Sequence, residues 1–103
     1  MAPPVLTDEQ RAAALARAAE VRRVRAEFKQ LLKTGSVRFS ELLERAEEDP
    51  AIAGMKVYAV LSSLPGTGKV KAKRLMESFG IAESRRLRGL GDRQRAALLD
   101  AFD

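Results

Sequence analysis

The fold depends most on residues 64–75, which read Leu64-Pro65-Gly66-Thr67-Gly68-Lys69-Val70-Lys71-Ala72-Lys73-Arg74-Leu75. Two glycines spaced by one residue allow a backbone turn that a ligand can approach closely. The turn opens a predicted helix, whose first N–H groups have no partner within the helix and lie at the positive end of its dipole. Such a helix start binds anions, and three lysines follow it closely. The segment therefore predicts a phosphate-binding turn.

The known nucleotide-binding loops do not fit this segment. A P-loop requires Gly-x-x-x-x-Gly-Lys followed by Ser or Thr, on the end of a parallel strand. Ser63 stands where the first glycine belongs, and Val70 stands where the metal-binding hydroxyl belongs. A dinucleotide fingerprint fails as well, because no βαβ unit surrounds the glycines.

Outside the turn, the sequence predicts helices throughout. Thr7-Asp8-Glu9-Gln10 matches a capping box that starts a helix of about 26 residues. Asp49-Pro50 ends one helix and starts the next, and Gly80 supplies a left-handed stop. The expected helices cover residues 8–34, 37–48, 50–63, 68–79 and 92–102. The sequence thus predicts an all-α fold, in which a long N-terminal helix packs on a small bundle.

Apolar spacing gives the expected core of a single domain, 1–103. In the long helix, Val21, Val24, Phe28 and Leu31 form the predicted buried stripe. We expect residues 1–20 to be mobile or to contact a partner, and residues 37–103 to form the helical core. The other positions expected to be buried are Phe39, Leu42, Leu43, Ala46, Ile52, Val57, Val60, Leu61, Leu64, Val70, Ala72, Leu75, Met76, Phe79, Ile81, Ala96, Leu98, Leu99 and Phe102. Leu87 and Leu90 would pack on the core if the arginine-rich segment 84–95 were only a solvated loop.

Composition argues against most enzymatic functions. Among 103 residues there is no Cys and no His, which removes disulfides, thiolate metal sites, cysteine nucleophiles and the usual general base. We therefore predict no catalytic residues, no metal and no cofactor. The start of the chain does not resemble a signal peptide, and no apolar run could span a membrane. The prediction is a cytoplasmic monomer.

Charge is concentrated in two basic zones. The chain has 19 Lys+Arg and 14 Asp+Glu, a net charge of +5. Residues 69–95 hold nine basic and three acidic residues, and residues 11–33 hold seven and two, whereas residues 36–50 hold two and five. In the first helix, one face carries only positive charge, from Arg22, Arg25, Lys29 and Lys33. Such zones suit a polyanion, although a solvated helix face has the same pattern.

The glycine turn resembles a DNA-binding element. Leu-Pro-Gly-x-Gly followed by Ala-x-x-Leu, here Leu64–Gly68 and Ala72–Leu75, is similar to helix-hairpin-helix and helix-two-turns-helix motifs, whose turn amides bind a DNA phosphate. Thr67 departs from the branched apolar residue usual at its position. A purely structural corner between two helices is the alternative.

Four blocks extend the resemblance to nearly the whole chain. Residues 7–15, Gly54-Met55-Lys56-Val57, residues 64–73 and the arginine-rich run 84–95 occur in this order. Together they resemble the mycobacterial-type integration host factors, nucleoid proteins of actinobacteria. The resemblance implies double-stranded DNA as partner, with little sequence preference, DNA bending or compaction, location in the nucleoid, and support of phage integrase–DNA complexes. The predicted DNA-binding residues are Pro65, Gly66, Thr67, Gly68, Lys69, Val70, Lys71, Lys73, Arg85, Arg86, Arg88, Gly89 and Arg93; the second candidate surface is Arg22, Arg25, Lys29 and Lys33.

That second surface has two interpretations: it contacts the same bent duplex, or it captures another. Two rival functions also remain. The first is an RNA- or ribosome-associated protein, since helix-two-turns-helix elements also occur there. The second is a fragment of a DNA-repair glycosylase, which would need a second lobe that 103 residues do not provide.

Overall fold

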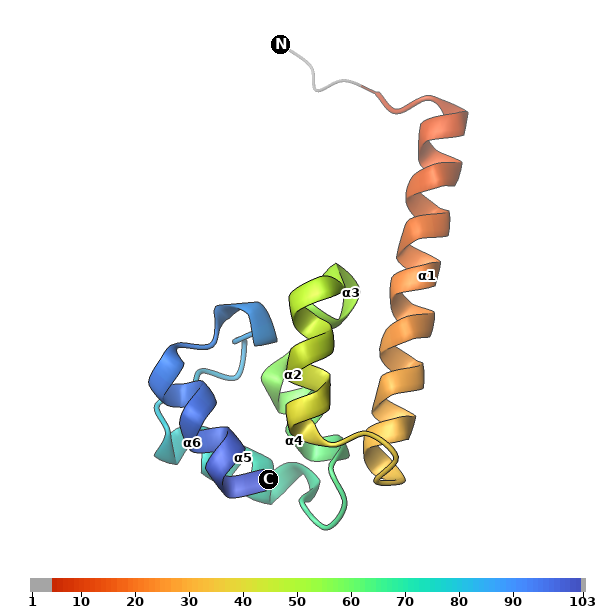
Figure 1. The fold of residues 1–103 in the computed structure, drawn as a ribbon. Coiled ribbons are helices and arrows are strands. Elements are labelled where there is room, and N and C mark those ends of the chain that lie inside the picture. Colours follow the sequence, from red (N-terminus) through yellow and green to blue (C-terminus); the bar gives the residue numbers. More distant parts are fainter. Residues whose placement is uncertain (1–4, 103) are drawn as a thin grey trace.

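The computed structural model describes residues 5–102 and is all-helical, with α1 standing along one side of a small bundle (Figure 1). Residues 1–4, part of the predicted 1–20 segment, lie outside this range. Within it, no helix is long and apolar enough to cross a membrane. The elements are α1 (Asp8–Lys33), α2 (Phe39–Glu48), α3 (Pro50–Ala53), α4 (Val57–Ser63), α5 (Gly68–Ser78), the 3₁₀ turn η1 (Leu87–Gly89) and α6 (Asp92–Phe102).

Local capping signals explain where these helices begin and end. The Thr7 Oγ1 accepts from the Gln10 N–H at 3.1 Å, and the Gln10 side chain accepts from the Thr7 N–H at 2.9 Å. Asp49 accepts from the Ala51 N–H at 2.9 Å and caps α3. Gly80 has φ +68° and ends α5. The predicted caps at these three places are confirmed.

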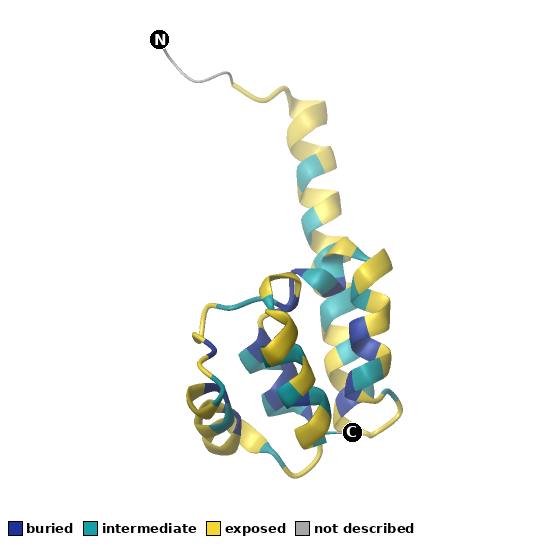
Figure 2. Ribbon diagram, turned by 60° about the vertical axis from the view of Figure 1, so that its left-hand side comes forward, coloured by how far each residue is buried: buried dark blue, intermediate teal, exposed yellow. Residues whose placement is uncertain are grey.

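The core is formed by α2, α4 and α5, with one buried residue each from α1, α3, η1 and α6 (Figure 2). Helix α1 packs on α3 and α4. In α1 the most buried residue is Leu32, with 0 % exposure, whereas Leu31, which was expected in the stripe, is only half-buried. The stripe therefore runs through Val24, Phe28 and Leu32, at spacings of four residues. The buried residues are Leu32, Phe39, Leu42, Leu43, Ile52, Met55, Val57, Val60, Leu61, Leu64, Ala72, Met76, Ile81, Leu87 and Leu98.

The structure corrects the predicted third helix, which is two helices rather than one. The chain leaves helical geometry after Ala53 and resumes it at Val57, so that Met55 is buried between α3 and α4. The reason is non-local: residues 55–57 pair with residues 85–87, at the isolated antiparallel bridge between Lys56 and Arg86.

Three smaller predictions about burial and bounds are also wrong. Helix α2 begins at Phe39, two residues later than expected. Val70 is 69 % exposed in the first turn of α5, and Ala96 is exposed in α6. Both lie at the correct helical period but at places where no other element covers them.

Replacing Leu32 by Ala tests the revised stripe. Because Leu32 is fully buried, we expect Leu32→Ala to lower the free energy of unfolding by about 2–5 kcal/mol. The half-buried Leu31 is the matched control, and Leu31→Ala should cost clearly less. Urea unfolding followed by circular dichroism measures both; equal losses would contradict the packing of α1.

Candidate nucleic-acid interface

The turn between α4 and α5 has a backbone that only glycine adopts without strain. Helix α4 ends at Ser63, and Leu64 anchors the turn in the core. Gly66 and Gly68 then have φ values of +73° and +68°, in the left-handed region that disfavours side chains. Helix α5 has no side-chain cap, unlike α1 and α3. Its first amides are therefore available to an anion.

The C-terminal part of α1 lies beside this turn. A shallow hollow of about 380 Å³ is lined by Ala26, Lys29, Gln30, Lys33, Ser62, Ser63, Gly68 and Lys69. Three ammonium groups from α1 and α5 thus surround the start of α5. The two serines point their hydroxyl hydrogens elsewhere, since Ser62 Oγ donates to Tyr58 O at 2.7 Å and Ser63 Oγ to Ala59 O at 2.8 Å.

A short β-type pairing attaches the arginine-rich segment to the start of α4. The Val57 N–H donates to the Arg85 carbonyl and the Leu87 N–H to the Met55 carbonyl, both at 2.9 Å. The Arg86 Nη1 also donates to the Gly54 carbonyl. These contacts fix Arg86 next to Lys56.

Arg86 and Lys56 line a second hollow that adjoins the first. Its volume is about 270 Å³, and its lining is Arg25, Lys29, Met55, Lys56, Ala59 and Arg86. Lys29 belongs to both hollows, so the two are contiguous. We call their cations the basic track: Arg25, Lys29, Lys33, Lys56, Lys69 and Arg86.

The two basic zones of the sequence therefore meet on one surface. Lys29 and Lys33 of the α1 face lie beside Lys69 of the turn. Arg25 departs from the predicted exposed face: it is half-buried, and its Nε donates to the Ala51 carbonyl at 2.8 Å. Arg22 is exposed on α1 and lines neither hollow.

The other predicted residues lie outside the two hollows. Arg88 lines a different hollow, with Leu43, Glu47 and Arg95. The Arg85 Nη1 donates to the Gly89 carbonyl at 2.6 Å, so this arginine and Gly89 shape their own loop. Arg93, Pro65, Val70 and Lys71 are exposed, Thr67 is half-buried, and Lys73 Nζ lies 3.3 Å from Glu83 Oε1.

Lys56 is a candidate that the sequence analysis did not select. It stands alone in an apolar run, Gly54-Met55-Lys56-Val57, so that no local charge pattern marks it. Only its place in the block shared with the resembled family could have indicated it. The structure shows why Lys56 is part of the basic track: the pairing with residues 85–87 places it opposite Arg86.

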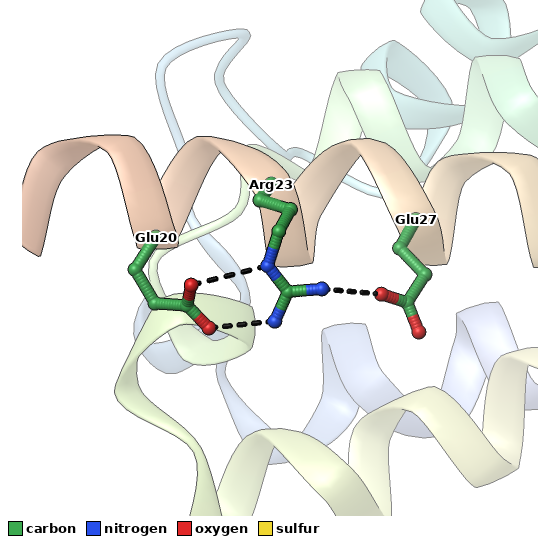
Figure 3. A network of polar contacts seen from close by, with 3 residues as sticks. All are labelled: Glu20, Arg23 and Glu27. Carbon is green, nitrogen blue, oxygen red and sulfur yellow. Dashed lines mark hydrogen bonds and ion pairs between the residues drawn. The ribbon is translucent and has the colours of Figure 1, made fainter.

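One arginine of α1 is neutralised by its own helix (Figure 3). Arg23 lies between two carboxylates, 2.6 Å from Glu20 Oε1 and 3.0 Å from Glu27 Oε2. The hydrogen bond and positive charge of Arg23 lower the pKa of Glu20, and the two carboxylates raise the pKa of Arg23. Both groups therefore stay ionised near neutral pH, and a polyanion would have to compete with these two carboxylates for Arg23.

Comparison with known proteins identifies the family of this chain. The family model for the S13-like H2TH domain matches residues 32–102. The integration host factor of Mycolicibacterium smegmatis is 57 % identical over 103 residues, covering 100 % of this chain and 98 % of its own length. This chain belongs to the integration host factor family. The Streptomyces coelicolor member is 55 % identical over 102 residues, covering 99 % of this chain and 95 % of its own.

A solved structure of the same family shows the same fold. The structure of sIHF bound to an 8-bp palindromic DNA superposes on this chain with a TM-score of 0.82 and is 49 % identical to it in sequence. The match covers 85 % of this chain and 99 % of that one. The all-α fold with a helix-two-turns-helix element is thus confirmed.

The aromatic side chains of this family member offer no stacking platform. Phe39 is buried, and Phe28, Tyr58, Phe79 and Phe102 are half-buried against the core. Base stacking on exposed rings, which single-strand and RNA binders use, therefore has no support on this surface. Within residues 5–102, no group of three or more Asp and Glu side chains is placed to hold a metal ion.

Two arginines differ in what they do for the fold. Because the Arg86 guanidinium bonds the Gly54 carbonyl in a half-buried place, Arg86→Ala should lower the free energy of unfolding by about 1–3 kcal/mol. Arg93 is exposed on α6, and Arg93→Ala should change the free energy of unfolding by less than about 0.5 kcal/mol. Thermal unfolding of both variants checks this, and an unchanged Arg86→Ala protein would contradict the bridging role.

Proposed function

We propose that this chain is a nucleoid-associated protein that binds duplex DNA with little sequence preference, and that it bends or compacts that DNA and supports site-specific phage integration. The proposal draws on the family's relatives, named integration host factors, and on the sIHF structure bound to DNA. We place the protein in the nucleoid as a monomer.

One observation carries the proposal: three cations of the basic track lie beside an uncapped helix start. Lys29, Lys33 and Lys69 share one hollow with Gly68, and no acidic residue lines either hollow. A duplex phosphate at the turn would accept from backbone amides while neighbouring phosphates met the lysines and Arg86. Such contacts position a duplex without reading its bases.

Because the track is continuous, we propose one duplex for each chain rather than two. The cations of α1 and those of the turn would then contact the same backbone. Phosphates would be neutralised on the side that faces the protein only. The remaining repulsion on the far side favours bending toward the protein, which offsets part of the cost of deforming the duplex.

Neither rival function gains support from the site. The half-buried aromatics favour duplex DNA over splayed RNA bases, and competition between duplex DNA and structured RNA at fixed salt separates these two. We also propose that the protein is not an enzyme. The charged groups of its site are all ammonium and guanidinium groups, and a glycosylase assay on damaged duplex should show no product.

Salt dependence tests the phosphate mechanism directly. Neutralising about four to eight phosphates should give a slope of about −4 to −7 in log association constant against log salt. Titration of a labelled duplex at several NaCl concentrations measures this slope. An affinity that hardly changes with salt would contradict the proposal, and the sequence of the duplex should alter the result little.

Substitutions at Gly68 and Gly80 distinguish a loss of phosphate binding at the turn from a loss of stability caused by backbone strain. Gly68 and Gly80 share the same φ, +68°, and a Cβ at either would meet open space. Each substitution to Ala should therefore cost a similar stability, about 1 kcal/mol. Only Gly68→Ala should also weaken duplex binding, because Gly80 lies at the other end of α5. Equal binding by the two variants would exclude the turn as the phosphate site.

A further inference from the structure

The N-terminal half of α1 projects beyond the bundle without a visible partner (Figures 1 and 2). Apart from Ala14, residues 8–17 are all exposed, including Leu15 at 63 %. The helix meets the core only from its middle onward, through Arg17, Val21 and Val24 beside α3 and through Leu32 in the core. This projecting half contributes no buried side chain to the core.

Five residues of α1 fall on one line along the helix. At 100° per residue, their directions agree within about 40°. From the N-terminal end, the line consists of Arg11, Leu15, Arg22, Lys29 and Lys33. Its last two members belong to the basic track, so that the line continues the proposed interface into the projecting half.

Negative charge is segregated to the opposite side of α1. Glu9, Glu20 and Glu27 lie about 140–160° away from the line. Glu20 and Glu27 hold Arg23 there (Figure 3). The one carboxylate near the line is Asp8, in the first turn, where it stabilises the helix dipole. Among the described residues, no ion pair occupies Arg11 or Arg22.

We propose that the projecting half of α1 is an arm that extends the duplex contact, with Arg11 and Arg22 meeting phosphates and Leu15 meeting the sugar edges between them. The inference rests on the proposed function. From Lys33, beside the turn, to Arg11 is 22 residues, or about 33 Å of helix, close to the ~34 Å of one turn of duplex. Arg11 therefore reaches a phosphate about one helical turn from the glycine turn.

Duplex length and a matched arginine make the test specific. Arg17 is the control, because it is also exposed in the same half of α1 but faces the α3 side. Alanine favours the helix, so Arg11→Ala and Arg17→Ala keep the arm and remove the same charge. The two duplexes are 8 bp, about 27 Å, which cannot engage turn and arm together, and 20 bp, about 68 Å, which can.

On the 20-bp duplex, we expect Arg11→Ala to make the salt slope shallower by about 0.9, equivalent to about a threefold smaller loss of affinity between 50 and 200 mM salt. On the 8-bp duplex it should change nothing, and Arg17→Ala should change nothing on either. Equal effects of the two variants, or no effect of Arg11→Ala on the long duplex, would overturn the arm.

Two further outcomes are distinguishable. If the unsubstituted protein bound neither duplex, the proposed function itself would fail. If it bound both with a salt slope that Arg11→Ala left unchanged, only the arm would be wrong. A second copy of the chain is the other partner that could bind this face, and sedimentation without DNA tests it. If the protein self-associated and Arg11→Ala abolished that self-association, the partner of this face would be a second copy of the chain and not the duplex.

Discussion

Two backbone hydrogen bonds between residues 55–57 and 85–87 organise the candidate interface. Burial of Leu87 anchors the arginine-rich segment in the core, and these two bonds set its register against residues 55–57. The Val57–Arg85 and Leu87–Met55 bonds hold this segment against the start of α4. Since Arg86 also bonds the Gly54 carbonyl, its guanidinium is placed beside Lys56 and within reach of α1.

This attachment turns scattered charge into one surface. The net charge of +5 is modest for 103 residues, and some of the positive charge is paired elsewhere, as in Arg95 with Glu47 and Arg23 with its two glutamates. The six cations of the basic track gather where α1 passes the glycine turn and the paired segment. Affinity for a polyanion depends on this local density of charge more than on the total.

Local signals allowed much of the fold to be predicted from sequence. The Thr7 box, the Asp49-Pro50 cap and the Gly80 stop act within a few residues of themselves, and the structure confirms them. The break between α3 and α4 could not be predicted in this way, because its cause lies thirty residues away in residues 85–87.

The candidate site follows the same division. The glycine turn was evident from its spacing, and Gly66 and Gly68 do have left-handed backbones. Helical periodicity placed Arg25 on the exposed basic face, but α3 packs close enough for the Ala51 carbonyl to accept its Nε–H. Lys56 was missed for the converse reason, because its neighbours in space come from another part of the chain.

The most direct test of a single continuous interface is an amide-shift titration with a short duplex. If the basic track binds one duplex, the amides around Lys29, Lys33, Gly68 and Arg86 shift together and saturate at one duplex per chain, with a common dissociation constant. If the shifts around Lys29 and Lys33 saturate separately from those around Gly68, or need a second equivalent of duplex, α1 and the turn bind different duplexes and the continuous track is wrong.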